Sequence, residues 1–315
     1  MALISNTSAT YNIVTLKQDA LDKIFMFERE ETPVYSSSPK EKCISTKTEW
    51  FNDTLTAAGS NAMAAGEVLT AEALTQATKS QNHTQILRKV VSVTGTNQAV
   101  DPFGTSDTMQ MQMAKKMREL KRDAEYAITQ NVASVASAAG VTPKLGGIET
   151  FITTNASRGA GGSGTGYNSG TGLTVAPTDG TQRVFTLDLL NTVLQTGYNN
   201  GAKFNKLHLG AFNKNRFSNF SGNATRTSEE KSTISTSITV YESDFGTITA
   251  AINPLQRTRV GILYGEDSVA IRNLRPIGKG KLAKTNDSDE EYILTEFTTR
   301  VVEKSMGIIA DLTTA

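Results

Sequence analysis

The glycines between residues 159 and 172 are the first candidates for chemistry in this sequence. Gly159, Gly161 and Gly164 satisfy the pattern Gly-x-Gly-x-x-Gly, which in dinucleotide-binding proteins brings a phosphate to the start of a helix. The stretch that follows, residues 167–177, carries no helix signal and no acidic residue to bind a ribose. We therefore predict a flexible surface loop without a ligand role over residues 159–172, because its seven glycines make ordering costly in entropy.

Metal and thiol chemistry also lacks the necessary partners. His83 and His208 lie far apart in the sequence, and neither has a His, Cys or carboxylate at the spacing of a zinc site. Cys43 is the only cysteine, which excludes an intrachain disulfide and suits a reducing cytoplasm. His208 falls in an apolar strand predicted over residues 206–209, so we interpret it as a structural histidine. We predict no metal site and no cofactor.

Acid–base and nucleophilic catalysis find no support either. The sequence contains no Gly-x-Ser-x-Gly elbow. Its adjacent carboxylates, Glu30 with Glu31 and Glu290 with Glu291, lie in charged stretches where little would shift a pKa. The Asp-Phe-Gly sequence at 244–246 is interpreted as a hairpin turn, because the other kinase motifs do not accompany it. We therefore predict no catalytic residue and no enzyme.

The overall composition narrows the classes of partner. The 315 residues include 32 Lys and Arg against 31 Asp and Glu, a net charge of +1. Such a balance argues against a surface built mainly to hold nucleic acid or an anionic membrane. No apolar run is long enough to span a bilayer, and the first 30 residues lack the features of a secretory signal. We expect a soluble protein with no membrane partner.

One long helix, predicted over residues 106–139, organises these elements. Its apolar residues recur every three or four positions and would lie on one face, with charged residues opposite. Ser106 or Asp107 can cap its start, and Gly140 marks its end. At 1.5 Å per residue the helix would be roughly 50 Å long, which favours a spine crossing a flat subunit over a core helix of an all-α bundle. The residues predicted to form its buried core are Met113, Met117, Leu120, Ala124 and Ile128.

A long hairpin is predicted before this helix. Polar and less polar side chains alternate over residues 46–50, as in a half-exposed strand. The β-branched stretch 84–94 is expected to be the strand that pairs with it. The excursion between them, residues 57–81, has few large apolar side chains and little core of its own. It should therefore find its stability on another surface. The candidate assembly residues are Trp50, Phe51, Met63, Leu69 and Leu74.

After the spine, helices and strands mix, as in an α+β protein. Helices are predicted over residues 186–197 and 213–220, and a polar loop over 222–233. The predicted strands are 148–154, 206–209, 238–242, 247–252, 259–264, 269–274, 292–304 and 306–311.

This order of elements, together with a series of short strings, resembles the major capsid protein of tailed bacteriophages with the Hong Kong 97-like fold. The resemblance covers about residues 31–312, and the strings look like those of a capsid subfamily long known only as a domain of unknown function. Among the strings that carry it are Thr46-Lys47-Thr48-Glu49-Trp50, Val91-Ser92-Val93-Thr94-Gly95-Thr96, Glu119-Leu120-Lys121-Arg122-Asp123, Gly147-Ile148-Glu149, Gly210-Ala211-Phe212-Asn213-Lys214, Leu274-Arg275-Pro276 and Gly307-Ile308-Ile309-Ala310-Asp311-Leu312.

The resemblance implies a domain plan and a function. Residues 1–40 would be an N-terminal arm, 41–100 an extended loop, 101–144 with 276–315 a peripheral domain containing the spine helix and the two last strands, and 145–275 an axial domain. Pentamers and hexamers of the chain would form an icosahedral shell around double-stranded DNA, which the shell would contact non-specifically. A separate scaffolding protein, a portal and decoration proteins would be further partners. Assembly would take place in the bacterial host cytoplasm, and the chain would end in the virion capsid.

Three other hypotheses stay open from the sequence. An encapsulin-like nanocompartment shell would share the fold and hold cargo protein instead of a genome. An enzyme would need an apolar pocket with convergent, pKa-shifted groups. A sequence-reading DNA-binding protein would need a basic recognition helix, whereas Glu119, Asp123 and Glu125 reduce the positive charge of the predicted spine.

Overall fold

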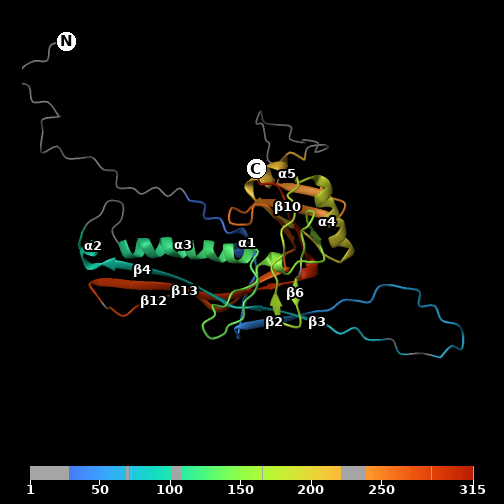
Figure 1. Cartoon of the computed structure of the whole chain (residues 1–315), viewed down its shortest axis with the longest axis horizontal. Helices are drawn as coiled ribbons and strands as arrows, with labels where there is room; N and C mark the ends of the chain where they lie inside the picture. The colour runs from blue at the N-terminus through green and yellow to red at the C-terminus, as the bar shows by residue number, and fades with distance from the viewer. Residues whose placement is uncertain are drawn as a thin grey trace, which may run out of the picture.

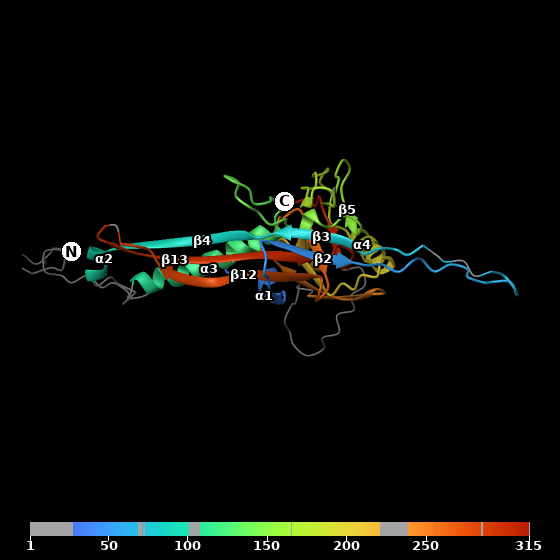
Figure 2. The same cartoon turned by 90° about the horizontal axis from the view of Figure 1, so that it is seen from below.

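The computed structural model describes residues 28–68, 71, 73–100, 108–164, 166–220, 239–284 and 286–314. Within them the chain forms an elongated body beside a more compact one (Figures 1 and 2). Helices and strands mix in both, which confirms the predicted α+β class. Residues 1–27 of the predicted arm, the predicted loop 222–233 and the start of the predicted spine lie outside the described residues.

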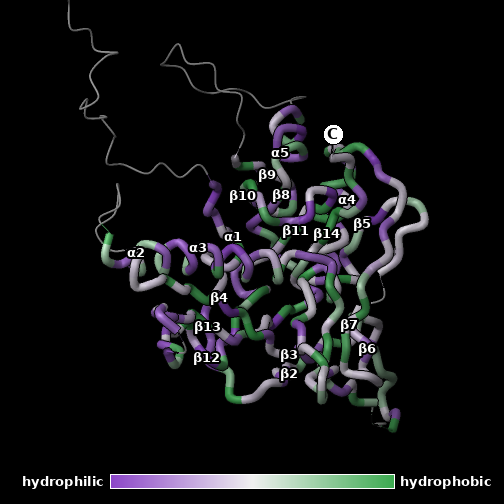
Figure 3. The backbone as a smooth tube through the Cα atoms, turned by 60° about the vertical axis from the view of Figure 1, so that its left-hand side comes forward, coloured by the Kyte–Doolittle hydropathy of each residue, from purple (hydrophilic) through white to green (hydrophobic). Residues whose placement is uncertain are grey.

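The elongated body is one helix lying along a four-stranded sheet. Helix α3 (Thr108–Thr129) packs on the sheet through Leu120 and Met113, which join Val91, Val93 and Ile293 in a buried cluster. The sheet order is β1 (Lys40–Lys42), β12 (Val269–Lys281), β13 (Ser288–Val301) and β4 (Gln85–Thr94), with short helix α2 (Gly95–Ala99) after β4. Figure 3 shows hydrophilic and less polar residues alternating along α3, as expected of a helix with one buried face.

The spine is shorter than predicted. Helix α3 ends at Thr129, ten residues before the predicted end, although apolar residues continue at helical spacing. The side chain of Gln130 donates to the Leu255 carbonyl at 3.0 Å, and the chain then turns so that Gly147 N donates to Val132 O. These long-range bonds replace the next helical turn. Met117, predicted to be buried, is 39% exposed, because the sheet covers a narrower stripe than the periodicity suggested.

The compact body is a six-stranded sheet covered by two helices. Its strand order is β5 (Ala156–Ser157), β14 (Met306–Ile309), β11 (Gly261–Tyr264), β8 (Lys206–Leu209), β10 (Gly246–Ile252) and β9 (Val240–Ser243). Helix α4 (Leu187–Asn199) packs against β14, and α5 (Ala211–Ser218) packs against β8 and β10. The last strand, β14, was expected beside the spine helix; this was wrong, because β14 pairs with β11 inside the compact body.

The hairpin pairs differently from the prediction. Strand β2 (Lys47–Asn52) pairs with β3 (Thr78–His83), whereas the predicted partner, now β4, pairs with β13 over ten residues. Strand β3 ends and β4 begins on either side of Thr84, whose buried hydroxyl donates to Glu296 Oε1 at 2.9 Å. The apolar stretch 84–94 therefore belongs to the sheet under the spine and not to the excursion.

Most other predicted elements are confirmed with shifted ends. The strand at 206–209 is found as predicted, and the helix predicted over 186–197 is α4, with the Thr186 hydroxyl accepting from Leu189 N at its start. The strand predicted over 148–154 is wrong, since Ile148–Thr150 forms a 3-10 turn in which Thr150 N donates to the Gly147 carbonyl at 3.0 Å. A second 3-10 turn, Glu303–Ser305, leads into β14.

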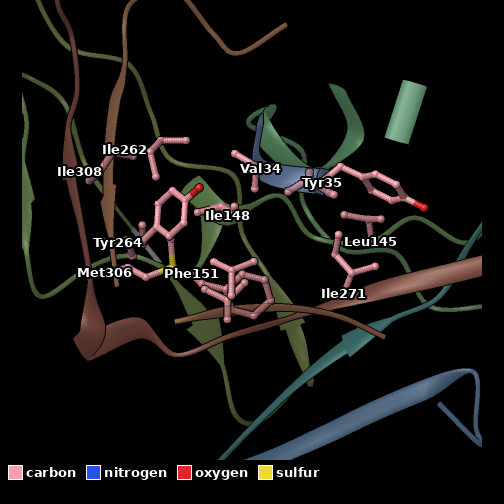
Figure 4. Packing of buried hydrophobic residues seen from close by; sticks show 14 of the residues in the cluster. Val34, Tyr35, Leu145, Ile148, Phe151, Ile262, Tyr264, Ile271, Met306 and Ile308 are labelled. Carbon is pink, nitrogen blue, oxygen red and sulfur yellow. The ribbon is translucent and has the colours of Figure 1, made fainter. Parts of the chain in front are cut away.

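A large apolar cluster joins the two bodies. It takes Val34 and Tyr35 from the short helix α1 (Pro33–Ser37), Ile148 from the 3-10 turn, and Tyr264 from β11. Figure 4 shows Tyr264, Ile148, Phe151 and Met306 gathered together, with Val34 and Tyr35 entering from α1. Because residues from both sheets share this core, the two bodies are packed as one unit.

Candidate assembly surfaces

The hairpin leaves the subunit and exposes apolar side chains. Beyond β2 and β3, the described residues between 53 and 77 run away from both bodies in the two views of the chain (Figures 1 and 2). Leu55 is 99% exposed, Leu74 91% and Val68 80%. The hydrogen bonds of this tip are local, as when Ala64 N donates to Glu67 Oε2. Such a ribbon buries little of itself, so these apolar groups are available to another surface.

The five residues chosen from the sequence do not form one surface. Phe51 and Met63 are exposed with Leu74, as an assembly role requires. Trp50 is only 7% exposed, and its ring packs 5.8 Å from that of Phe151 in the core of its own subunit. The assembly prediction is therefore wrong for Trp50, because alternation along β2 turns it inward. Leu69 lies outside the described residues.

The spine residues divide in the same way. Met113, Leu120, Ala124 and Ile128 are buried, and Met117 is not. Ala124 and Ile128 belong to the core that joins the two bodies, and Leu120 and Met113 to the cluster between α3 and the sheet.

Sequence reasoning placed Glu125 on the wet face of the spine, but the structure buries it completely. Its carboxylate accepts from Val34 N at 3.1 Å, Tyr35 N at 2.6 Å and Asn253 Nδ2 at 2.5 Å. Burial raises the pKa of this carboxyl, and the three N–H donors oppose that effect. Glu125 thus ties helix α1, the spine and the compact body together. Only partners distant in sequence reveal this role.

A second buried carboxylate, Asp311, follows β14. Oδ2 accepts from Gly159 N at 2.9 Å, and Oδ1 accepts from Gly180 N at 2.8 Å and from the Arg259 guanidinium at 2.9 Å. Asp311 has a φ of 60°, the left-handed region that few residues other than glycine adopt. Asp311 therefore holds the chain at Gly159, where the predicted loop begins, and at Gly180, beyond its end. Most of the described residues between 160 and 171 are exposed, so the loop lies at the surface as predicted, but it is fixed at its start.

His208 is enclosed between the strands of the compact body. Its Nε2 lies 2.7 Å from the Tyr264 hydroxyl, and the two rings stack at 5.2 Å. Burial lowers the pKa of His208 to about 4 and raises the pKa of Tyr264 to about 12. Both groups are neutral near pH 7, which fits the structural interpretation of His208.

Acid should weaken the fold through His208. The folded pKa of about 4 lies below the ordinary 6.5, so the unfolded chain binds the extra proton first as the pH falls. The contribution of His208 to the free energy of unfolding is fully present above about pH 6.5. It is lost as the pH falls to 4, and the loss is about 3 kcal/mol in total. We expect urea unfolding of wild type and His208→Gln to converge as the pH is lowered from 7 to 4. Parallel curves would contradict this. His83 is present in both proteins, so its contribution cancels.

Neither a membrane span nor a metal cluster is found in the part of the chain that the structure describes. No helix there is both long and apolar enough to cross a membrane. Nor do three metal-binding side chains come together among those residues.

A spine helix along a sheet, a compact body and a projecting hairpin are the architecture of phage capsid subunits. The Cyanophage A-1(L) capsid asymmetric unit matches with a TM-score of 0.65 at 12% identity, over 98% of this chain and 100% of that one. The capsid of a native GTA particle matches with a TM-score of 0.64 at 9% identity, also over 98% and 100%. These likenesses define the class: the chain has the Hong Kong 97-like phage capsid fold.

The sequence comparison identifies the family. The profile of the SU10 major capsid protein family matches residues 3–313, and the chain belongs to this family of structural capsid proteins. It is also 33% identical over 103 residues to the major capsid protein of Escherichia phage Phieco32. That match covers 32% of this chain and 29% of the relative's length.

Proposed function

We propose that this major capsid protein assembles as pentamers and hexamers into an icosahedral head shell that encloses double-stranded DNA. Family membership supports the capsid role. The observation that supports self-assembly is the projecting hairpin, whose most exposed apolar groups are Leu55, Val68 and Leu74. Closed symmetric assembly supplies many equivalent surfaces on which such groups can be buried. No observation favours an encapsulin-like shell over a phage head.

The other partners are part of the same proposal. A separate scaffolding protein, a portal and decoration proteins would act with the shell, which would form in the host cytoplasm. The near-zero net charge supports contact with DNA that is non-specific and weak. The proposed domain plan keeps residues 1–40, 41–100, 101–144 with 276–315, and 145–275. Within this plan β4 and β14 are exceptions, because each pairs with strands of a neighbouring region.

Removing the hairpin tip should stop assembly without unfolding the subunit. Replacing residues 60–76 by a two-residue turn removes intersubunit area but little of the subunit's own core, so stability should change by about 1 kcal/mol. Size-exclusion chromatography with light scattering, beside thermal melting, should show a folded monomer or capsomer and no shells. Intact particles would refute the assembly role, as would an unfolded product.

A second variant separates the side chains from the length of the loop. Leu55→Ser, Val68→Ser and Leu74→Ser together keep the ribbon intact and remove its exposed apolar groups. We expect the same loss of shells. Val184→Ser is the matched control, because Val184 is about half exposed but lies outside the hairpin. It should assemble normally.

A further inference from the structure

We propose that the glycine-rich segment, residues 158–181, is a bracket that fixes the direction in which the hairpin leaves the subunit. The segment links the six-stranded sheet to the root of the hairpin, defined here as Gln81 and Asn82 with Trp50. No part of the domain plan explained its glycines. The consequence for shell assembly rests on the function proposed above, whereas the mechanical role can be measured without it.

The bracket begins at Asp311, which anchors both of its ends to the compact body. Gly159 and Gly180 each donate a backbone N–H to this carboxylate. The two backbone runs cross so closely there that a Cβ on Gly159 would collide with the Thr181 carbonyl oxygen. Glycine is needed at this crossing for close approach and not for mobility.

The middle of the bracket is bonded to the chain that follows the spine. Ser134 and Thr174 exchange two hydrogen bonds of 2.8 Å, each hydroxyl accepting from the other residue's backbone N–H. Asn131 Nδ2 donates to the Pro177 carbonyl at 2.8 Å. Both Ser134 and Thr174 are buried, so water does not compete well for these bonds.

The turn of the bracket, between its two anchored ends, reaches the hairpin. Two short strands, β6 (Tyr167–Asn168) and β7 (Leu173–Thr174), form a small hairpin that presents the Gly172 carbonyl to Gln81 Nε2 at 2.5 Å. Gly172 has a φ of +70°, and a Cβ there would occupy the position of the Gln81 amide. Gln81 is 5% exposed, although it lies on a strand that continues into the exposed tip.

The root is held from other sides as well. The Asn82 side chain accepts from Gly146 N at 2.8 Å and donates to the Thr299 carbonyl at 3.2 Å. Trp50 packs on Phe151. The bracket adds one further contact to the root. Through the Gly172 carbonyl it connects Gln81 to the six-stranded sheet.

The length of the hairpin makes this contact important. A hairpin with about 12 residues on each side can reach roughly 40 Å from its root. A rotation of about 10° at the root would then move the tip by about 7 Å, more than an interface of fitted side chains accommodates. A bracket at the root is thus an efficient way to define where the tip contacts a second copy.

The test measures the hairpin direction by electron spin resonance distances between labels at Ser60→Cys and Lys203→Cys. Labelled full-length chain is diluted with unlabelled chain so that only distances within one subunit are seen. Native Cys43 is buried, and a sample without the introduced cysteines gives its background. We expect Gln81→Ala to broaden the distance distribution at least twofold. Lys79→Ala is the matched control, since Lys79 lies two residues nearer the tip on β3 and is exposed; it should leave the width unchanged.

A second variant acts on the bracket alone. Thr174→Val keeps the size of the side chain and leaves the bond between Gln81 and Gly172 in place, but removes the hydroxyl that accepts from Ser134 N. We expect it to broaden the distribution as well, in a chain that is somewhat less stable but still folded by circular dichroism, because the buried Ser134 N–H loses its acceptor. Unchanged widths in both Gln81→Ala and Thr174→Val would overturn the bracket. Shell formation by the broadened variants would leave the bracket standing and count against the assembly role of the hairpin, so the two proposals fail separately.

Discussion

We expect Leu120→Asp to prevent the chain from folding. Leu120 is 1% exposed and lies at the centre of the cluster that joins α3 to the sheet. The change removes its apolar burial, at about 2–5 kcal/mol, and places a carboxylate among Val91, Val93 and Ile293, at several kcal/mol more. The sum, about 5–10 kcal/mol, is comparable to the roughly 5–15 kcal/mol by which a typical domain is stable. The measurements are soluble yield, circular dichroism and urea unfolding.

Met117→Asp is the matched control on the same helix. Met117 lies one turn before Leu120 but is 39% exposed, so a carboxylate there stays in water. We expect a change within about 1 kcal/mol and normal yield. Equal damage from both substitutions would show that Met117 is buried as the periodicity predicted, and normal folding of Leu120→Asp would refute the packing of the spine.

The second large effect is expected at Asp311. Asp311→Ala leaves Gly159 N and Gly180 N without their acceptor, removes one of the two carboxylates that pair with Arg259, and places alanine at a φ of 60°. Each buried backbone donor that loses its acceptor costs about 1–3 kcal/mol, and an alanine in the left-handed region costs about 1–2 kcal/mol more. We expect destabilisation of about 4 kcal/mol in urea unfolding, with increased proteolysis between residues 158 and 181.

Two further variants separate the causes. Asp311→Asn tolerates the left-handed backbone and keeps one acceptor, so it should lose about half as much. Asp267→Ala makes the same chemical change at an exposed turn and should be close to neutral. A loss at Asp311→Ala no greater than that at Asp267→Ala would mean that the carboxylate does not hold the segment.

What the sequence determined by itself was the set of local elements and the family resemblance. Helix α4 has its apolar face and its Thr186 cap within fifteen residues, and strand β8 is a short apolar run, so both were found near their true positions. The resemblance depended on short strings in a fixed order, and the family match over residues 3–313 confirms it. The exposed tip of the hairpin was also predictable, because its composition cannot make a core.

The tertiary structure alone decided which elements meet. Periodicity showed that β2 and β4 are strands, but not that β2 pairs with β3 while β4 pairs with β13. Periodicity also predicted a spine helix that continues to residue 139, whereas the helix ends at Thr129. The carbonyl of Leu255, to which Gln130 donates, lies 125 residues away in the sequence and could not be foreseen from local spacing. In the sequence, Glu125 and Asp311 look like ordinary charged residues. The structure shows that both are buried and accept hydrogen bonds from donors up to 152 residues away. Local spacing carries no information on such partners, since burial and hydrogen bonding across long separations exist only once the chain has folded.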